Sequence, residues 1–397
     1  MKKIISLLAI VCASFTVSAQ YYQDSNNPDI LHIRQPRNLT RTEFLIPNID
    51  GYNGYKADLH THTVYSDGSV AMDARVRDAW KDGLDIMAVT EHLEYRANEP
   101  HMVKWMKGYV KKGAKAENWY ITRYPVMPER KDLHTDFQYP VEHAQKVAKS
   151  YDITIIPGIE ITREPLVYGH FNCLFTTDNN AIHGATCDES IRNAKAQGAL
   201  IMHNHPGWRR KSMDMLEFDK KIYEEKLIDG IEIMNGAEFY PKAITRALEH
   251  NLFMTSNSDI HVVSEREGGQ PQRNMTFIFA KDKSLASIRE AIEAHRTIAY
   301  SFGTIAGEES LLRKFVEGAL EVRTAGVDKK GKAQYVIKNN SSVEFLVRFE
   351  GGNLVTVGGL SSTFIKEQKA GQKTLVIESA WCGEDKHLQI EIVSLMK

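Results

Sequence analysis

The sequence lacks an excess of charge of either sign. Its 397 residues include 50 lysines and arginines against 51 aspartates and glutamates, which gives a formal net charge of -1. A chain with this balance has no general attraction for nucleic acid or for an anionic membrane. A hydrophobic fraction of 42% and a charged fraction of 25% are ordinary for a globular protein that holds one large domain and a small one. Any function must therefore come from local groups of residues.

Cysteine is scarce, with four residues in the whole chain. Cys173, Cys187 and Cys382 follow Cys12 at irregular spacings, which is not a disulfide framework, although an exported chain could form one bridge. Cys173 lies in an apolar run, where we expect a buried structural thiol. Nothing beside these cysteines indicates nucleophilic catalysis.

Long apolar runs are missing after residue 19, so we expect neither a transmembrane helix nor another membrane anchor. The first 19 residues are typical of a signal peptide: two lysines, an apolar stretch at 4–17, and a small-x-small cleavage signal ending at Ala19. Val11 is too large for lipoprotein processing at Cys12. We therefore predict cleavage after Ala19 and a periplasmic or secreted protein.

Short apolar runs alternate with amphipathic stretches from residue 55 to about residue 299. The expected strands are 55–59, 85–90, 153–159, 171–175, 199–203, 230–234, 252–256 and 275–280. The expected helices are near 71–82, 141–150, 188–197, 214–226, 241–250 and 284–295. This alternation predicts an α/β domain with a parallel sheet, and seven or eight such units favour a barrel over an open sheet.

The remaining segments suggest how the chain is organised. We expect an N-terminal arm at 20–53, a main domain at 54–316 and a β-rich C-terminal domain at 317–397, whose strands are short and antiparallel. An insert at about 95–150 is rich in aromatic and basic residues. It is either a lid over the site or an insertion packed by its own aromatics. The C-terminal domain would pack against the main domain or form a dimer.

Side chains that can bind metals stand at the ends of these strands. They are His60, His62, Asp67, His92, Glu160, His170, His203, His205, Asp259 and His261. A His-x-His pair on a strand directs both imidazoles to one face, and the carboxyl ends of barrel strands gather at one end of the barrel. Imidazole and carboxylate without thiolate favour Zn, Mn or Fe over Ca. There are too many ligands for one tetrahedral ion, so we expect two to three divalent ions, with Glu160 available to bridge.

In chain order these motifs resemble those of the PHP (polymerase and histidinol phosphatase) superfamily of metal-dependent phosphoesterases. The motifs are Asp58-Leu-His-Thr-His-Thr63, Thr90-Glu-His92, Gly158-Ile-Glu160, Gly169-His-Phe-Asn172, Asn204-His-Pro-Gly-Trp208 and Ser258-Asp-Ile-His261. The resemblance spans about 55–315 and is closest to secreted bacterial phosphodiesterases of the Sb-PDE family, which share the run Ile231-Glu-Ile-Met-Asn-Gly236. It implies a distorted (β/α)7 barrel with a trinuclear metal centre.

The resemblance also implies a ligand set. His60, His62, Glu160 and Asp259 would hold the first ion; Glu160 would bridge to a second ion held by His170 and His205; Asp67, His92 and His261 would hold the third. His203 departs from the family pattern. By strand alternation His203 and His205 would face the same way, so His203 competes as a ligand. We favour His205 because Pro206 and Gly207 fix it in the family's turn.

These features predict a hydrolase of phosphodiesters or phosphomonoesters. The ions would clamp the phosphoryl oxygens and lower the pKa of a bound water toward about 7, so that a bridging hydroxide attacks phosphorus in line. Asp259 or His261 would manage its proton, with Glu160 as the bridging carboxylate. Arg163 and Arg209 would bind the phosphate unless they are ordinary surface arginines; Arg96 and Arg266 are weaker candidates.

Two other functions remain open from the sequence. The same ions could polarise a carbonyl, as in an amidohydrolase acting on C–N bonds, or the chain could be a non-catalytic binding protein. We expect a small phosphorylated substrate as the partner and no stable nucleic-acid complex, because the only basic run lies in the insert and a solvated helix face explains it. A homodimer stays open.

Overall fold

The computed structural model describes residues 40–99, 102, 106–109, 135–162, 168–264 and 273–396. The expected signal peptide, most of the N-terminal arm, and most of the insert with its basic run lie outside these residues. Arg163 and Arg266 also lie outside them. What the sequence predicts for these segments therefore stays a prediction.

The larger of the two main sheets has the strand order β16-β15-β18-β12-β11-β10-β1-β2-β3, with β19 paired to β18. Its strands are β1 (Asn53–Asp58), β2 (Ile86–Ala88), β3 (Thr154–Ile156), β10 (Met275–Ala280), β11 (Thr297–Ser301), β12 (Thr304–Ala306), β15 (Phe345–Phe349), β16 (Val355–Val357), β18 (Thr374–Gly383) and β19 (Lys386–Glu391). Nearly every residue of β10 and β11 is buried, because this part of the sheet is covered on both faces.

The second sheet has the order β4-β5-β6-β7-β8, with β9 paired to β7. Its strands are β4 (Gly158–Thr162), β5 (His170–Leu174), β6 (Leu200–Asn204), β7 (Gly230–Asn235), β8 (Glu238–Phe239) and β9 (Phe253–Asn257). The two sheets meet on one side through a backbone bridge between His92 and Glu160. On the other side Ser256 of β9 donates its backbone N–H to Thr276 of β10 (3.0 Å) and its hydroxyl to the carbonyl of Tyr300 in β11 (2.7 Å).

The prediction of a parallel sheet was wrong for two strands. β5 runs antiparallel to both β4 and β6, and β10 runs antiparallel to both β1 and β11. The pairs β1–β2, β2–β3, β6–β7 and β7–β9 are parallel, as expected. β5 is reversed because it follows β4 with no helix between them among the described residues. Its first residue therefore lies at the same edge as the last residues of β4 and β6.

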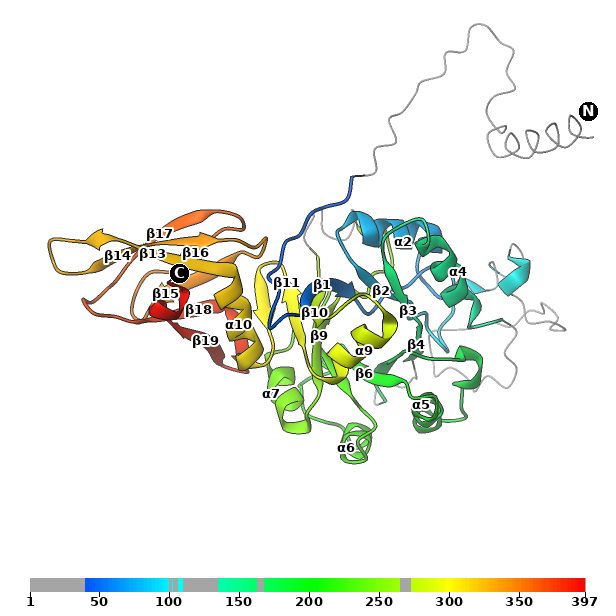
Figure 1. Ribbon diagram of the computed structural model, residues 1–397. Coiled ribbons are helices and arrows are strands. Elements are labelled where there is room, and N and C mark those ends of the chain that lie inside the picture. The colour runs from blue at the N-terminus through cyan, green and yellow to red at the C-terminus, as the bar shows by residue number, and fades with distance from the viewer. Residues whose placement is uncertain are drawn as a thin grey trace, which may run out of the picture. The chain divides into compact units, whose positions relative to one another are not determined.

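Helices cover the outer faces of these two sheets, and α2 and α4 lie side by side (Figure 1). The helices are α2 (Met72–Lys81), α4 (Tyr139–Ala148), α5 (Cys187–Ala196), α6 (Glu217–Glu224), α7 (Pro241–His250), α9 (Leu285–Glu293) and α10 (Glu309–Ala319). The six helices expected from the sequence are confirmed, with small shifts at their ends. Their starts follow local chemistry: the hydroxyls of Thr186 and Ser284 cap α5 and α9, and α7 begins at Pro241.

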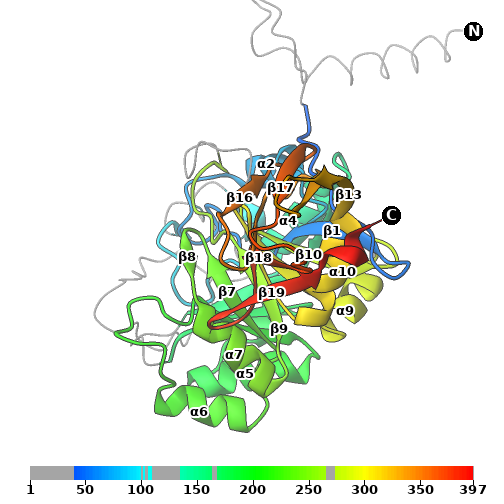
Figure 2. The same cartoon turned by 90° about the vertical axis from the view of Figure 1, so that its left-hand side faces the viewer.

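The C-terminal part is rich in strands, as predicted. β13 (Leu320–Val327), β14 (Ala333–Asn339) and β17 (Ser362–Lys366) form a three-stranded antiparallel sheet. The other C-terminal strands extend the ten-stranded sheet, because β18 pairs in parallel with β12 at Ile305 and Ala380. α10 packs against β13, β18 and β19 (Figure 2). The predicted boundary at 316/317 thus falls inside α10, and the sheet is continuous across it.

Three cysteines in the described part, Cys173, Cys187 and Cys382, are buried free thiols. Within the described residues, no helix combines the length and the apolar character that crossing a membrane would require.

A buried group of charges ties the end of β1 to the start of β10. Asp58 is fully buried, and its carboxylate accepts hydrogen bonds from Arg273 and from the backbone and side chain of Ser258. Arg273 also donates to Asp82 beyond the end of α2 (2.9 Å). These contacts hold the segments that follow β1 and β9 next to each other.

Replacing Arg273 with Ala would leave the Asp58 carboxylate buried without its cation, so we expect the free energy of unfolding to fall by about 3–5 kcal/mol. Urea denaturation measures this loss. Arg348→Ala is the control, because Arg348 is more than a third exposed and pairs with Glu378 at the surface, where such pairs contribute about 0–1 kcal/mol. Equal losses in the two variants would contradict the role assigned to Arg273.

Candidate metal centre

The chain segments that carry the expected ligands are held together through their backbones. Asp58 accepts hydrogen bonds from the backbone N–H groups of His60 and Ser258, both at 3.2 Å. Arg75 of α2 is fully buried and donates to the carbonyls of His62 (3.1 Å) and Ile260 (3.0 Å). The loops 60–62 and 258–261 are therefore fixed relative to each other before any ligand contact is considered.

A first group of ligand atoms converges between the ends of β1 and β9 and the middle of β4. The Nε2 atoms of His60 and His62 lie 3.0 Å apart, and Oδ1 of Asp259 lies 3.2 Å and 3.0 Å from them. The Glu160 carboxylate is 3.5 Å from each of the two nitrogens. Lone pairs that point at one place favour a cation there.

A second group of side chains lies near Oε1 of Glu160, the oxygen that also faces His60. His170, the first residue of the reversed strand β5, has its Nδ1 atom 3.5 Å from Glu160 Oε1, and His205 Nε2 is 3.8 Å from the same oxygen. Asn204 donates to this oxygen at 2.8 Å. His205 and Asp259 have φ values of +26° and +53°, a conformation that is uncommon for residues other than glycine. Such backbone strain is concentrated at functional sites.

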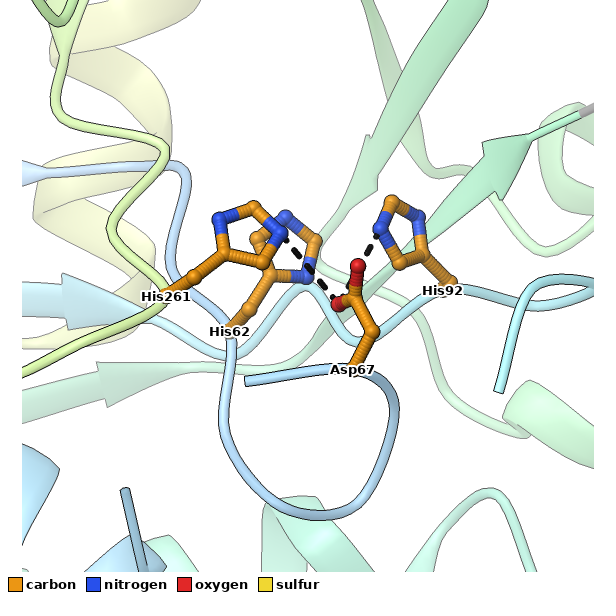
Figure 3. A group of neighbouring side chains, drawn as sticks. All are labelled: His62, Asp67, His92 and His261. Carbon is orange, nitrogen blue, oxygen red and sulfur yellow. Dashed lines mark ion pairs between the residues drawn. The ribbon is translucent and has the colours of Figure 1, made fainter. Parts of the chain in front are cut away.

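The third group is shown in Figure 3: the Asp67 carboxylate points between His92 and His261, and His62 lies behind His261. Oδ1 of Asp67 is 3.4 Å from Nε2 of His92 and 3.2 Å from Nε2 of His261. The His62 ring stacks on both of these imidazoles, with centroid distances of 4.3 Å and 4.4 Å. His62 therefore joins the first group to the third.

The structure brings together all the residues expected as ligands. Within each of four groups, the ligand atoms lie within 4.8 Å of one another: His62, Asp67, His92 and His261; His60, His62 and Glu160; His60, His205 and Asp259; Glu160, His170 and His205. Which ion each residue binds stays a prediction.

The imidazoles and carboxylates shift each other's pKa values strongly. Burial disfavours the charged form of His92, but the carboxylates of Asp67 and Glu160 outweigh it and raise the pKa of His92 to about 10. Burial, together with His92 and His261, lowers the pKa of His62 to about 3. Burial would raise the pKa of Asp67, but His92 and His261 hold it far below its ordinary value. Such mutual perturbation is typical of a functional site.

The expectation that His203 faces the same way as His205 was wrong. His203 is fully buried, packs on Phe171 and lies 2.8 Å from the hydroxyl of Tyr223, away from the ligand groups. Strand alternation ends at Asn204, whose side chain reaches Glu160. The positive φ of His205 then turns the side chain of His205 back toward the ligand groups.

Of the predicted phosphate-binding arginines, Arg209 is described and Arg163 is not. Arg209 is exposed, and its guanidinium carbon lies 4.3 Å from the centroid of the Trp208 ring. That ring contacts His170 and His205, at 5.5 Å and 5.2 Å between centroids. Arg209 therefore lies beside the second group. Arg96 is fully buried and donates to the carbonyl of His92, so it stabilises the backbone of this expected ligand.

Two supporting residues were missed from the sequence. Thr162 lies two residues after Glu160, and its hydroxyl is 2.6 Å from Nδ1 of His92. Glu232, in the middle of β7, is fully buried with Oε1 2.9 Å from Nδ1 of His60. The available signal was a lone carboxylate inside the apolar run Gly230-Ile-Glu-Ile-Met234, which is a costly placement unless the carboxylate has partners.

Comparison with known protein families matches residues 58–348 to the PHP domain. The chain belongs to the PHP domain family. A two-domain protein of Bacteroides vulgatus containing a predicted PHP-like metal-dependent phosphoesterase has the same fold, with a TM-score of 0.73, 28% identity, and coverage of 91% of this chain and 99% of that one.

A lesion-specific endonuclease from Pyrococcus furiosus has 18% identity and a TM-score of 0.40, with coverage of 69% of this chain and 62% of that one. Among curated proteins, no match was found.

The donor set of this PHP domain fits divalent metal ions. Glu160 Oε2 is buried and makes no hydrogen bond with the described residues. Nδ1 of His92 lies 2.6 Å from Glu160 Oε2, but this contact lacks hydrogen-bond geometry. A buried carboxylate oxygen and convergent ring nitrogens are stabilised by a cation at that place.

We expect Glu160→Gln to lower the number of ions bound per chain by at least one, because the amide of Gln is neutral and cannot bridge two cations. Elemental analysis of dialysed protein counts the ions, and circular dichroism checks the fold. Glu378→Gln, in the C-terminal part, is the control. An unchanged ion count in Glu160→Gln would contradict the position of Glu160 between two ion sites.

Proposed function

We propose that this protein is a metal-dependent phosphoesterase that hydrolyses phosphodiesters, and phosphomonoesters as a secondary class. The observation that carries the proposal is the position of Glu160, which is fully buried between two groups of histidines. Membership of the PHP family and the fold shared with a protein that contains a predicted PHP-like metal-dependent phosphoesterase support it.

The proposal includes a trinuclear centre of Zn, Mn or Fe. His60, His62, Glu160 and Asp259 would hold the first ion, Glu160, His170 and His205 the second, and Asp67, His92 and His261 the third. When bound, such ions supply the positive charge that an anionic ester requires and acidify water at neutral pH. Two of the groups of ligand atoms, one of His60, His62 and Glu160 and the other of Glu160, His170 and His205, fall within the first and second sites and support this assignment.

The residues of the chain would position the substrate and move its protons. Asp67, Asp259 and His261 are partly exposed, whereas His60, His62 and Glu160 are fully buried, so we place the substrate's approach on the exposed side. Asp259 or His261 would accept the proton that the attacking water loses. Arg209, stacked on Trp208, would hold a phosphoryl oxygen, because a guanidinium matches the geometry of phosphate.

The proposal also covers the type of barrel, the functional relatives, and the location and substrate of the protein. The two sheets, joined at the His92–Glu160 bridge and through Ser256, would correspond to the distorted (β/α)7 barrel of the family. The relatives with the most similar activity would be the secreted Sb-PDE phosphodiesterases. The chain would be exported after cleavage at Ala19 and act on a small phosphorylated substrate without a stable nucleic-acid complex.

We expect purified protein with Mn²⁺ or Zn²⁺ to hydrolyse a chromogenic phosphodiester, and to hydrolyse the matching monoester more slowly. A chelator should abolish the activity, and Glu160→Gln should lose it while remaining folded, because a phosphoester is not attacked without the ions. An acyl amide is assayed in parallel. Cleavage of the amide alone would show an amidohydrolase, and no cleavage with a full complement of metal would favour a binding protein.

Arg209→Ala should lower kcat/KM for the phosphodiester by about 10- to 100-fold, because a hydrogen bond to a charged group is worth about 1.5–3 kcal/mol. Arg209→Lys should recover only part of this loss, since lysine keeps the charge but not the planar fork. Lys211→Ala is the control, because Lys211 is an exposed cation two residues away. Identical steady-state kinetics for Arg209→Ala and Lys211→Ala would remove Arg209 from the substrate site.

A further inference from the structure

We propose that Glu232 is a positioning residue that serves two ion sites at once, by fixing the tautomer of His60 and the backbone of His205. The inference rests on the proposed metal centre. Glu232 lies in the middle of β7, between β6, which leads to His205, and β9, which leads to Asp259. It is outside the predicted ligand set, and its side chain is fully buried.

Both oxygens of Glu232 are used, and each has two partners. Oε1 lies 2.9 Å from Nδ1 of His60 and accepts a hydrogen bond from the side-chain amide of Asn257 at 2.9 Å. Oε2 accepts from the backbone N–H of His205 at 2.8 Å and from the side-chain amide of Asn235 at 2.9 Å. The three partners other than His60 contribute N–H groups, so the group as a whole is built around an acceptor.

The contact with His60 determines which nitrogen of that ring faces the site. An ionised carboxylate only accepts hydrogen bonds, so the imidazole nitrogen beside it must carry the proton. A proton on Nδ1 leaves the lone pair on Nε2, the atom that lies near His62 Nε2 (3.0 Å) and Asp259 Oδ1 (3.2 Å). A carboxylate behind a histidine ligand orients the ring and makes it a stronger donor to metal.

The contact with His205 stabilises an unfavourable backbone conformation at that residue. His205 has a φ of +26° and precedes Pro206, which is a disfavoured conformation for a residue with a side chain. The hydrogen bond from its N–H to Glu232 offsets part of this cost. In the proposed centre His60 binds the first ion and His205 the second, so one carboxylate would fix a ligand of each of two ion sites.

The test compares two buried carboxylates. Glu232→Gln keeps the shape but turns an amide group toward donors. Glu367→Gln is the matched control: Glu367 is also buried, in the C-terminal part, and accepts from the backbone of Ala333 and Gly371 at 2.8 Å and 3.1 Å. We expect both variants to lower the thermal stability of metal-free protein. Only Glu232→Gln should weaken the binding of Zn²⁺, by about 10- to 100-fold in a chelator competition.

Equal zinc affinities for Glu232→Gln and Glu367→Gln would overturn the proposal, and so would a wild-type chain that binds no zinc. If Glu232→Gln does not fold, the wild-type protein provides the answer. Nitrogen NMR of zinc-loaded protein, with the signals of His60 assigned by their loss in His60→Gln, should show a proton on Nδ1 and zinc on Nε2. Zinc on Nδ1, or an unprotonated Nδ1, would contradict the role of Glu232.

These measurements use zinc alone and no substrate, so they are independent of the reaction. A loss of zinc affinity in Glu232→Gln combined with no phosphoester cleavage by the wild type would support the positioning role and reject the phosphoesterase. Phosphoester cleavage by the wild type combined with unchanged zinc affinity in Glu232→Gln would support the phosphoesterase and reject the positioning role.

Discussion

A carboxylate without access to water must be compensated by positive charge or hydrogen bonds, and this constraint governs the centre of the molecule. Glu160 is fully buried at the middle of β4, where both of its oxygens face histidine rings. The reversed direction of β5 and the left-handed backbone of His205 both serve to bring a ring toward this one side chain. Glu160 is the one side chain toward which both arrangements bring a ligand.

Most strands and helices of the main part could be predicted, because each strand is a short apolar run and each helix is amphipathic. Strand direction could not, since alternation of side chains looks the same whichever way a strand runs. The direction of β5 depends on the chain turning back directly after β4, and that of β10 on its place between β1 and β11. Short strands such as β8 and β12, with two and three residues, are too brief for a pattern.

The residues that converge could be predicted from their places at strand ends and from the family motifs, but their orientation could not. The predicted orientation of His203 was wrong because side chains alternate only while the backbone stays extended, and the strand ends at Asn204. Glu232 lies in the run 231–236 that resembles the Sb-PDE family, but that run does not indicate which groups the carboxylate contacts. Its importance comes from its hydrogen bonds with Asn257, with the backbone of His205 and with Asn235 at the end of the same strand, and the first two of these are distant in the sequence.

The pairing of β12 with β18 has a consequence for the order of assembly. β18 is contributed by residues 374–383, close to the C-terminus, yet it belongs to the same sheet as β1. β1 itself pairs with β10, more than two hundred residues later in the chain. Contacts between such distant segments form slowly, because the loops between them must close first. The ten-stranded sheet that contains β1 can therefore be complete only after residues 374–383 have been synthesised.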